Sequence, residues 1–387
     1  MSSRPPVYLD YNATAPTRPE VRRRTEELLL ELERGALGNA SSIHWAGRAT
    51  KKALEEARSS IAKRLRRKPS QILFTGGGTE ADNLAILGTL GAAPASFRIV
   101  TSTVEHPAVR QAIASAKSRG AEVVEVPVSA TGALDLTAFD GALESQRRVL
   151  VSIMAVNNET GVRFPIDEVV RKAKAKNALV HIDAIQAAGR VPIELDADLI
   201  TLSSHKLGGL SGTGVLATSD RVVLTPQVVG GAQERGYRAG TEGLIGAVAA
   251  ALALELAERD RQAEAIRLGA LRDQLDESIR AIPGSVILGA SESRVAQTTT
   301  ALFDQIEGDA LVQLLDLEGI AVSTGSACAS GSLEPSHVLL AMGIDERRAL
   351  AAIRISMGYR TVAEDVERLI EELPRAVRRC RATPSPL

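Results

Sequence analysis

Two side chains in this sequence, Lys206 and Cys328, combine nucleophilic chemistry with unusual neighbours. Lys206 follows LITLSSH, in which two serines and a histidine come directly after an apolar, strand-like stretch. A lysine in a dry pocket has a lowered pKa and can form a Schiff base with an aldehyde. The alternative is a solvated surface lysine, and the compact polar groups just before Lys206 weigh against that alternative.

Cys328 lies in STGSACASGSLEPS, a run of small residues without helix or strand periodicity. We expect such a run to form a flexible, exposed loop. An exposed free thiol is normally a liability, so its presence suggests a nucleophile, although an inert loop cysteine explains the residue equally well. The other cysteine, Cys380, lies in an amphipathic C-terminal stretch and is interpreted as structural or incidental.

Two further features follow strand-like stretches. GGGTEADN comes after QILFT, and its glycines, the start of a helix and the Thr79 hydroxyl could together cradle a phosphate. A tight turn with Thr79 as a helix cap explains the same residues at least as well, because the motif is neither a Walker loop nor a full GxGxxG. Asp183 ends LVHID, where a carboxylate could keep a ring nitrogen protonated, but alone it is better explained as a cap.

Three other positions could take part in the chemistry. His106 in TSTVEHPAV could act as an acid, a base or a stacking partner, and VNNETG and Arg354 in AIRIS are further candidates. His44, His181 and His337 are interpreted as core or surface residues. Since no two histidines share metal-ligand spacing, the sequence predicts no metal site.

The elements around these residues predict an α/β fold. Short apolar runs alternate with amphipathic stretches from about residue 70 to about 220, and two of the helical stretches, PAVRQAIASAKSRG and PIDEVVRKAKAKN, open with proline. This alternation predicts a mostly parallel central sheet covered on both faces. Ligands of such sheets bind beyond the carboxyl ends of the strands, where Asp183 and Lys206 fall.

A long helical pattern after GTEGLIG runs to about Arg280 and is interpreted as a connector between domains. Beyond it, TTTALFD predicts a strand and DALVQLLDLEG a helix of a smaller α+β domain. We therefore predict three parts: residues 1–15, an N-terminal segment that packs with the small domain; residues 16–257, the large domain; and residues 258–387, the small C-terminal domain with the cysteine loop.

Composition excludes several classes of protein. The chain has 387 residues, 44% of them hydrophobic and only 3% aromatic, with a formal net charge of −1. A balance this even provides no global field for nucleic acid or anionic membranes, and the few aromatics argue against a base-stacking platform. The two cysteines indicate no disulfide framework, and no stretch reads as a signal peptide or membrane span, so we expect a cytoplasmic protein.

Taken together and in this order, the motifs resemble the cysteine desulfurases, pyridoxal-phosphate enzymes of the class V aminotransferase group with fold-type I architecture. The resemblance runs from YLDYNATAP through GNASS, FTGGGTEADNLAI, TSTVEHPAV, SIMAVNNETG, HIDAIQ, SSHK, GGAQERGYRAGT and GSACASGSLEPSHVL to IRIS, nearly the whole chain. The long Ser/Gly/Ala cysteine loop is similar to that of the iron–sulfur assembly and nitrogenase-type branch.

The resemblance implies a role for each motif residue. Lys206 would hold pyridoxal phosphate as a Schiff base, Asp183 would pair with the ring nitrogen, and His106 would stack on the ring and help to move protons. Asn158 and Gln186 would hold the ring's phenolic oxygen side, and Arg354, with Asn158, would bind the substrate carboxylate. The implied phosphate ligands are Gly78, Thr79, Ser203, His205 and, from a neighbouring subunit of a homodimer, Thr241.

The resemblance also implies the reaction. L-Cysteine would be converted to L-alanine, and its sulfur would pass to Cys328 as a persulfide and then to an acceptor protein, for example an iron–sulfur scaffold. A selenocysteine lyase or another class V enzyme is the alternative, although plain transamination needs no thiol. A scaffold protein that keeps the fold without turnover is a third reading, and the presence of Lys206, Asp183 and Cys328 together counts against it.

Overall fold

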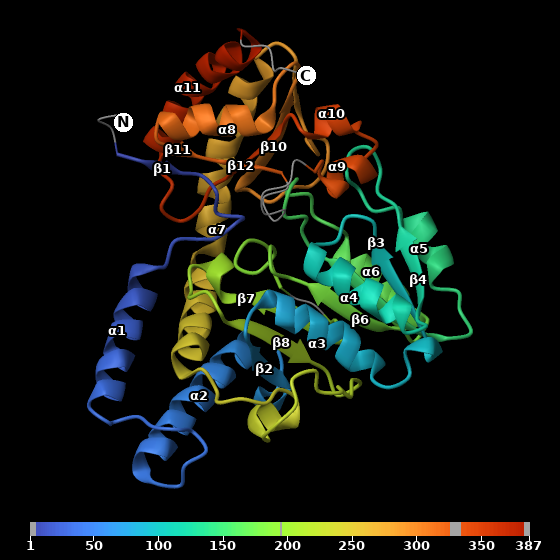
Figure 1. Cartoon of the computed structure of the whole chain (residues 1–387), viewed down its shortest axis with the longest axis vertical. Helices are drawn as coiled ribbons and strands as arrows, with labels where there is room; N and C mark the ends of the chain where they lie inside the picture. The colour runs from blue at the N-terminus through green and yellow to red at the C-terminus, as the bar shows by residue number, and fades with distance from the viewer. Residues whose placement is uncertain (1–4, 194–195, 326–333, 383–387) are drawn as a thin grey trace.

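The computed structural model describes residues 5–193, 196–325 and 334–382 (Figure 1). Its larger part is built on a seven-stranded sheet in the order β2-β8-β7-β6-β5-β3-β4, and only β8 runs antiparallel to its neighbours. The prediction of a mostly parallel sheet is therefore confirmed. The strands are β2 (Ile72–Thr75), β3 (Phe97–Ser102), β4 (Glu122–Val126), β5 (Arg148–Met154), β6 (Leu179–Asp183), β7 (Leu199–Ser203) and β8 (Gly214–Thr218).

Helices cover both faces of this sheet because successive strand residues point to opposite sides. Leu199 packs with one face, against α3 (Gly78–Leu90) and α4 (Pro107–Ser118), whereas Ile200 packs with the other. The second face carries α2 (Trp45–Arg64), α5 (Leu136–Ala142), α6 (Ile166–Ala175) and the first half of α7 (Leu244–Arg280). Pro107 opens its helix as predicted, but Pro165 caps α6, which begins one residue later.

The smaller part has its own antiparallel sheet in the order β12-β13-β10-β9 and a separate core. Two long helices, α7 and α11 (Ala363–Ala382), and the shorter α8 (Gly308–Leu317) pack on it. Near the N-terminus, β1 (Val7–Tyr8) pairs in parallel with β11 (Ile320–Ala321). The remaining strands and helices are β9 (Ser285–Ile287), β10 (Thr298–Phe303), β12 (Ser323–Thr324), β13 (Ala352–Ser356), α1 (Pro19–Glu33), α9 (His337–Ala341) and α10 (Glu346–Ala349).

The long helical pattern predicted after GTEGLIG corresponds to α7, whose residues contribute to both cores. Figure 1 shows this helix passing from the lower, larger part to the upper, smaller one. The domain boundaries at residues 15 and 257 stay a prediction. Within the described part of the chain, no helix has the length and apolarity needed to cross a membrane.

One buried ion pair ties the start of the sheet to a distant loop. Arg58 of α2 donates from both terminal nitrogens to Glu234, at 2.8 and 2.9 Å, and the Glu234 carboxylate also accepts the backbone N–H of Phe74 at 3.0 Å. The side chains of Arg58 and Glu234 are 4% and 3% exposed, and the guanidinium lies over the Phe74 ring. The pair therefore fixes β2, which leads into the glycine turn at Gly76.

We expect Arg58→Ala to lower the free energy of unfolding by about 3–5 kcal/mol, because it leaves the Glu234 carboxylate buried without its partner. Arg22→Ala is the matched control, since it breaks an exposed pair with Glu26 and should cost only about 0.5 kcal/mol. Urea unfolding followed by circular dichroism measures both. Equal losses in the two variants would contradict this assignment.

Candidate active site

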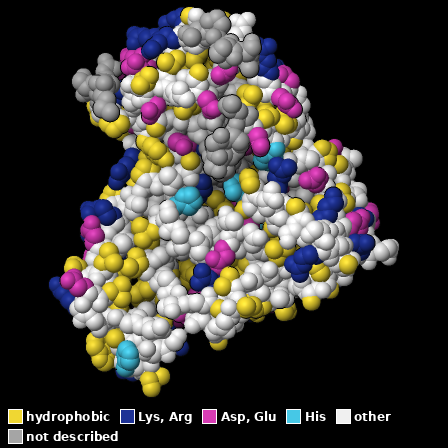
Figure 2. Space-filling view, viewed as in Figure 1, with side chains coloured by type: hydrophobic (Ala, Val, Ile, Leu, Met, Phe, Trp, Pro, Cys, Tyr) yellow, Lys and Arg dark blue, Asp and Glu magenta, His cyan; other side chains and the backbone are white. Residues whose placement is uncertain are grey.

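The candidate residues meet where the strands of the large sheet end. Asp183 is the last residue of β6, Ser203 is the last of β7, and His106 follows β3 at the start of α4. Lys206 lies in a short 3-10 helix, Ser204–Leu207, directly after β7. Figure 2 shows histidine side chains grouped where the larger and smaller parts of the molecule meet.

Lys206 is half-buried and turned toward the N-terminal segment. Its Nζ donates to the backbone oxygens of Asn12 and Ala13, both at 2.6 Å. Gln186 Nε2 donates to the same Asn12 oxygen at 3.1 Å. The amino group is therefore positioned by backbone carbonyls rather than solvated, and the surface-lysine alternative is wrong.

Asp183 is 6% exposed and accepts the backbone N–H of Ile185 at 2.9 Å. Burial raises its pKa to about 6, while that backbone hydrogen bond and the positive charge of Lys206 oppose the shift. A carboxylate this deeply buried has to be matched by a cationic partner to stay ionised. Asp183 is thus suited to bind a protonated ring nitrogen.

A second carboxyl group, Asp82 of α3, is fully buried and lies near enough to Asp183 for their charges to interact. Burial, with the negative charge of Asp183, raises the pKa of Asp82 well above its usual range. Its Oδ1 lies 3.6 Å from Nε2 of His181, a ring bonded on its other nitrogen to Ser152. Burial lowers the pKa of His181 to about 3, so this ring is neutral, as expected for the core residue it was interpreted to be.

The glycine turn fits closely against the ends of the strands. A Cβ added to Gly78 would stand 2.4 Å from Ile185 Cδ1 and 3.3 Å from Ser203 Cβ, and one added to Gly214 would stand 2.3 Å from the Gly77 oxygen. Because position 78 is a glycine, the backbone at the start of α3 lies next to Ser203. A larger residue at this position would clash. Thr79 at this helix start is exposed, as an approaching anion requires.

Both histidines next to Lys206 are neutral at physiological pH. Burial and the charges of Lys206 and His337 lower the pKa of His106 to about 4, and burial and Lys206 lower the pKa of His205 to about 4. His106 Nδ1 accepts the backbone N–H of Ala108 at 3.1 Å, which places the ring proton on Nε2. His205 Nδ1 lies 3.0 Å from the Thr14 hydroxyl.

Arg354 of β13 brings the smaller sheet into the site. The residue is 2% exposed, and its guanidinium donates to Asp10 Oδ1 at 2.9 Å and to the Asn158 backbone oxygen at 3.2 Å. Its Nε is buried and has no hydrogen-bond partner among the described residues. A second guanidinium, that of Arg190, lies nearby. Burial lowers the pKa of Arg190 to about 9, and the positive charge of Arg354 adds to this lowering. The site therefore offers strong donors to an anionic group.

Sequence reasoning and structure agree unevenly. Several predicted site residues meet at the carboxyl ends of the strands of the large sheet: Lys206, Asp183, His106, Gln186 and Ser203, with Gly78, His205, Asn158 and Arg354 around them. Thr241, by contrast, is exposed in the loop before α7. Cys328 lies outside the described residues. Among those residues, no cluster of His, Cys, Asp or Glu is placed to hold a metal ion.

Several buried positions around the site are not predicted by the sequence. Asn12 lies in the motif YLDYNATAP, but nothing in the sequence indicates that its backbone oxygen accepts from Lys206. Asp82 and Glu105 are fully buried carboxyls in the motifs TEADN and VEHP, and nothing in these polar motifs distinguishes them from exposed residues. Glu159, in VNNETG, belongs to the same group.

The profile of the family described as aminotransferase class-V matches residues 7–369. A cysteine desulfurase of Cereibacter sphaeroides is 44% identical over 382 residues, and an IscS-like cysteine desulfurase of Mycobacterium tuberculosis is 40% identical over 386, each match covering 97% of both chains. A NifS-like protein superposes with a TM-score of 0.88 at 34% identity, covering 96% of this chain and 99% of that one. The structure of SspA in complex with cysteine gives 0.79 at 28% identity, covering 91% and 98%.

The buried carboxyl group of Glu105 makes the free energy of unfolding depend on pH. Burial raises its pKa to about 8, against hydrogen bonds from Ser102 and the Met154 N–H that favour the ionised form. Because the folded-state pKa lies above the unfolded value of 4.5, the stability from Glu105 is present below about pH 4.5 and is lost as the pH rises through about 8.

Glu105→Gln should remove that part of the pH dependence, an effect on the order of a few kcal/mol. Urea unfolding midpoints at pH 5 and pH 8 should then differ less in the variant than in the unmodified protein. An unchanged difference would show that Glu105 does not titrate in this range.

Proposed function

This chain belongs to the class-V aminotransferase family and, within it, to the cysteine desulfurases; from that premise we propose that Lys206, Asp183, Arg354 and Cys328 convert L-cysteine to L-alanine and an enzyme persulfide. The observation that carries the proposal is the meeting of Lys206 and Asp183 at one sheet edge, where the lysine charge favours the ionised carboxylate. The family's cofactor is pyridoxal phosphate, and these two groups fit it at its aldehyde and ring nitrogen.

When bound, pyridoxal phosphate supplies an aldehyde that captures amines and a ring that accepts electrons from the substrate's Cα. Asp183 would hold the ring nitrogen, His106 would lie against the ring, and Gln186 and Asn158 would lie beside its phenolic oxygen. The close approach at Gly78 is a cradle that a side chain would fill, which supports a phosphate there. Thr79, Ser203 and His205 would complete that cradle, with Thr241 from a second copy in a homodimer.

Lys206 would serve both as anchor and as base. With substrate bound, Nζ would accept the proton from the substrate's Cα, and the carbonyls of Asn12 and Ala13 would keep that nitrogen in position. His106 is neutral because of its lowered pKa, so it adds no positive charge that would compete with Lys206 for Asp183.

Arg354 would hold the substrate carboxylate. A guanidinium presents its donors as a planar fork that matches a carboxylate, and the buried Nε still has donor capacity. The bonds to Asp10 and to the Asn158 oxygen fix the plane of that fork. Because the guanidinium comes from the smaller sheet, the substrate would bind between the two parts of the molecule.

The transfer of sulfur to Cys328 needs no added oxidant. The Cys328 thiolate attacks the sulfur of the bound cysteine, an S–S bond forms, and the substrate's C–S bond breaks. The electron pair of that bond stays with the carbon skeleton, which takes up a proton and leaves as alanine. The persulfide on Cys328 would then pass its outer sulfur to a thiol-bearing acceptor protein, for which an iron–sulfur scaffold in the cytoplasm is our proposal.

Replacing the thiol tests its role. Cys328→Ser should keep the visible absorption of the bound cofactor and the spectral change on adding L-cysteine, but lower sulfide release under reductant by at least about a hundredfold. Cys380→Ser is the control and should release sulfide normally. Undiminished sulfide release by Cys328→Ser would remove the nucleophile from the proposal.

Replacing the anchor tests the covalent attachment. After borohydride reduction, peptide mapping of the unmodified protein should find the pyridoxyl group on Lys206, and Lys206→Ala should carry no reduced adduct on any lysine. Lys52→Ala, a change at an exposed helix position, should label as the unmodified protein does. Stoichiometric labelling of a different lysine in Lys206→Ala would refute the assignment.

A further inference from the structure

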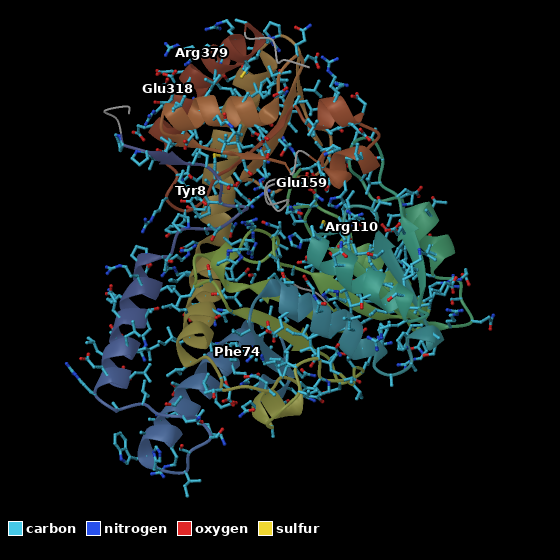
Figure 3. The ribbon with its side chains drawn as sticks, in the orientation of Figure 1. Tyr8, Phe74, Arg110, Glu159, Glu318 and Arg379 are labelled. Atoms are coloured by element: carbon cyan, nitrogen blue, oxygen red, sulfur yellow. The ribbon has the colours of Figure 1, made fainter. Side chains whose placement is uncertain are left out.

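Glu159 is a buried carboxylate that the proposed chemistry does not use. It lies in the turn after β5, at the junction between the two parts of the molecule (Figure 3), and is 4% exposed. Burying a carboxylate costs free energy unless the protein supplies partners for it. Its surroundings therefore indicate what it holds.

The turn fixes the direction of the Glu159 side chain. Asn157 Oδ1 accepts the backbone N–H groups of Glu159 and Thr160 at 3.0 and 2.9 Å. The Glu159 backbone oxygen in turn accepts the Thr300 hydroxyl of β10 at 2.6 Å. The backbone around Glu159 is thus bound to both sheets, and its side chain has a rigid base.

The carboxylate contacts two residues that are far from it in sequence. Ser336 Oγ donates to Glu159 Oε2 at 2.5 Å and accepts the Leu339 N–H at 3.3 Å, as the cap of α9. On the other side, a Cβ added to Gly325 would stand 3.0 Å from the same Oε2. One oxygen atom therefore accepts a hydrogen bond from Ser336 and lies close to Gly325.

Gly325 and Ser336 flank the residues that include Cys328 in the sequence. The neighbouring turn residue, Asn158, gives its backbone oxygen to Arg354. The same turn is therefore bonded to Arg354 and to Ser336, and it lies close to Gly325.

We propose that Glu159 is a positioning residue that holds Ser336 through a hydrogen bond and packs beside Gly325, so that these two described residues, which flank Cys328 in the sequence, keep their place relative to Arg354. The inference rests on the proposed function for the role of Cys328. The charge of Arg354 supports it, since it favours the ionised carboxylate although burial raises the pKa of Glu159 to about 7. Glu159 itself touches no reacting atom.

The first measurement is hydrogen–deuterium exchange on the full chain without cofactor or substrate, read on the peptide that contains α9. Glu159→Ala and Ser336→Ala should each raise exchange there by about fivefold, the factor that corresponds to one lost hydrogen bond. Because no chemistry takes place, this measurement tests the hold on Ser336 even if Cys328 proves not to be the nucleophile.

The second measurement is steady-state turnover of L-cysteine by the holoenzyme. Glu159→Ala should lower kcat by at least about fivefold and leave KM within about threefold, because Arg354 keeps its bonds to Asp10 and Asn158. Glu159→Gln keeps an oxygen that can accept from Ser336, so it should restore most of kcat. If Glu159→Ala does not fold, Ser336→Ala carries both measurements, since it removes a single hydroxyl.

Asp276→Asn is the matched control. Asp276 is also a buried carboxylate that accepts from one hydroxyl, that of Thr299, but it belongs to α7 and faces the guanidinium groups of Arg294 and Arg280. The Asp276→Asn substitution should change neither the hydrogen–deuterium exchange of α9 nor kcat. Faster exchange with a normal kcat in Glu159→Ala would make Glu159 merely structural and overturn the proposal, as would changes no larger than those of Asp276→Asn.

Discussion

The positive charge of Lys206 is the constraint to which the rest of the site is adapted. Two backbone oxygens, of Asn12 and Ala13, keep the ammonium between the sheet edge and the N-terminal segment. From there it helps to lower the pKa of His106 and of His205 and opposes the burial that raises the pKa of Asp183. One cation thus favours neutral imidazoles and an ionised carboxylate at the same edge of the sheet, which is the charge pattern that suits a protonated aromatic ring.

Asn12 links the two sheets through hydrogen bonds. The side-chain nitrogen of Asn12 donates to the Asn158 oxygen and to Thr298 of the smaller sheet, and the Asn12 backbone N–H donates to Ser356. Its backbone oxygen meanwhile accepts from Lys206 and Gln186 on the larger sheet. Residues near the start of the chain therefore set the distance between the amino group of one part and the guanidinium of the other.

The sequence predicted the strands of the large sheet and α7 well because periodicity and flanking glycine and proline residues report local preferences. The motif residues Lys206, Asp183 and His106 could be found for the same reason, since each follows a recognisable strand. Asp82 and Glu159 could not be found, because their importance comes from what packs against them from distant parts of the chain. Asn12 escaped for a different reason: its contribution to Lys206 is a backbone oxygen, which any residue type supplies.

Helix α7 has a consequence for how this molecule can move. Its 37 residues contain no proline and rise about 55 Å as one unbroken rod, with side chains embedded at both ends. Because α7 packs into both cores, a large rotation of the smaller part against the larger part would bend this helix or unpack one of its ends. Packing on α7 therefore couples the position of the sheet edge that carries Lys206 to that of the strand that carries Arg354.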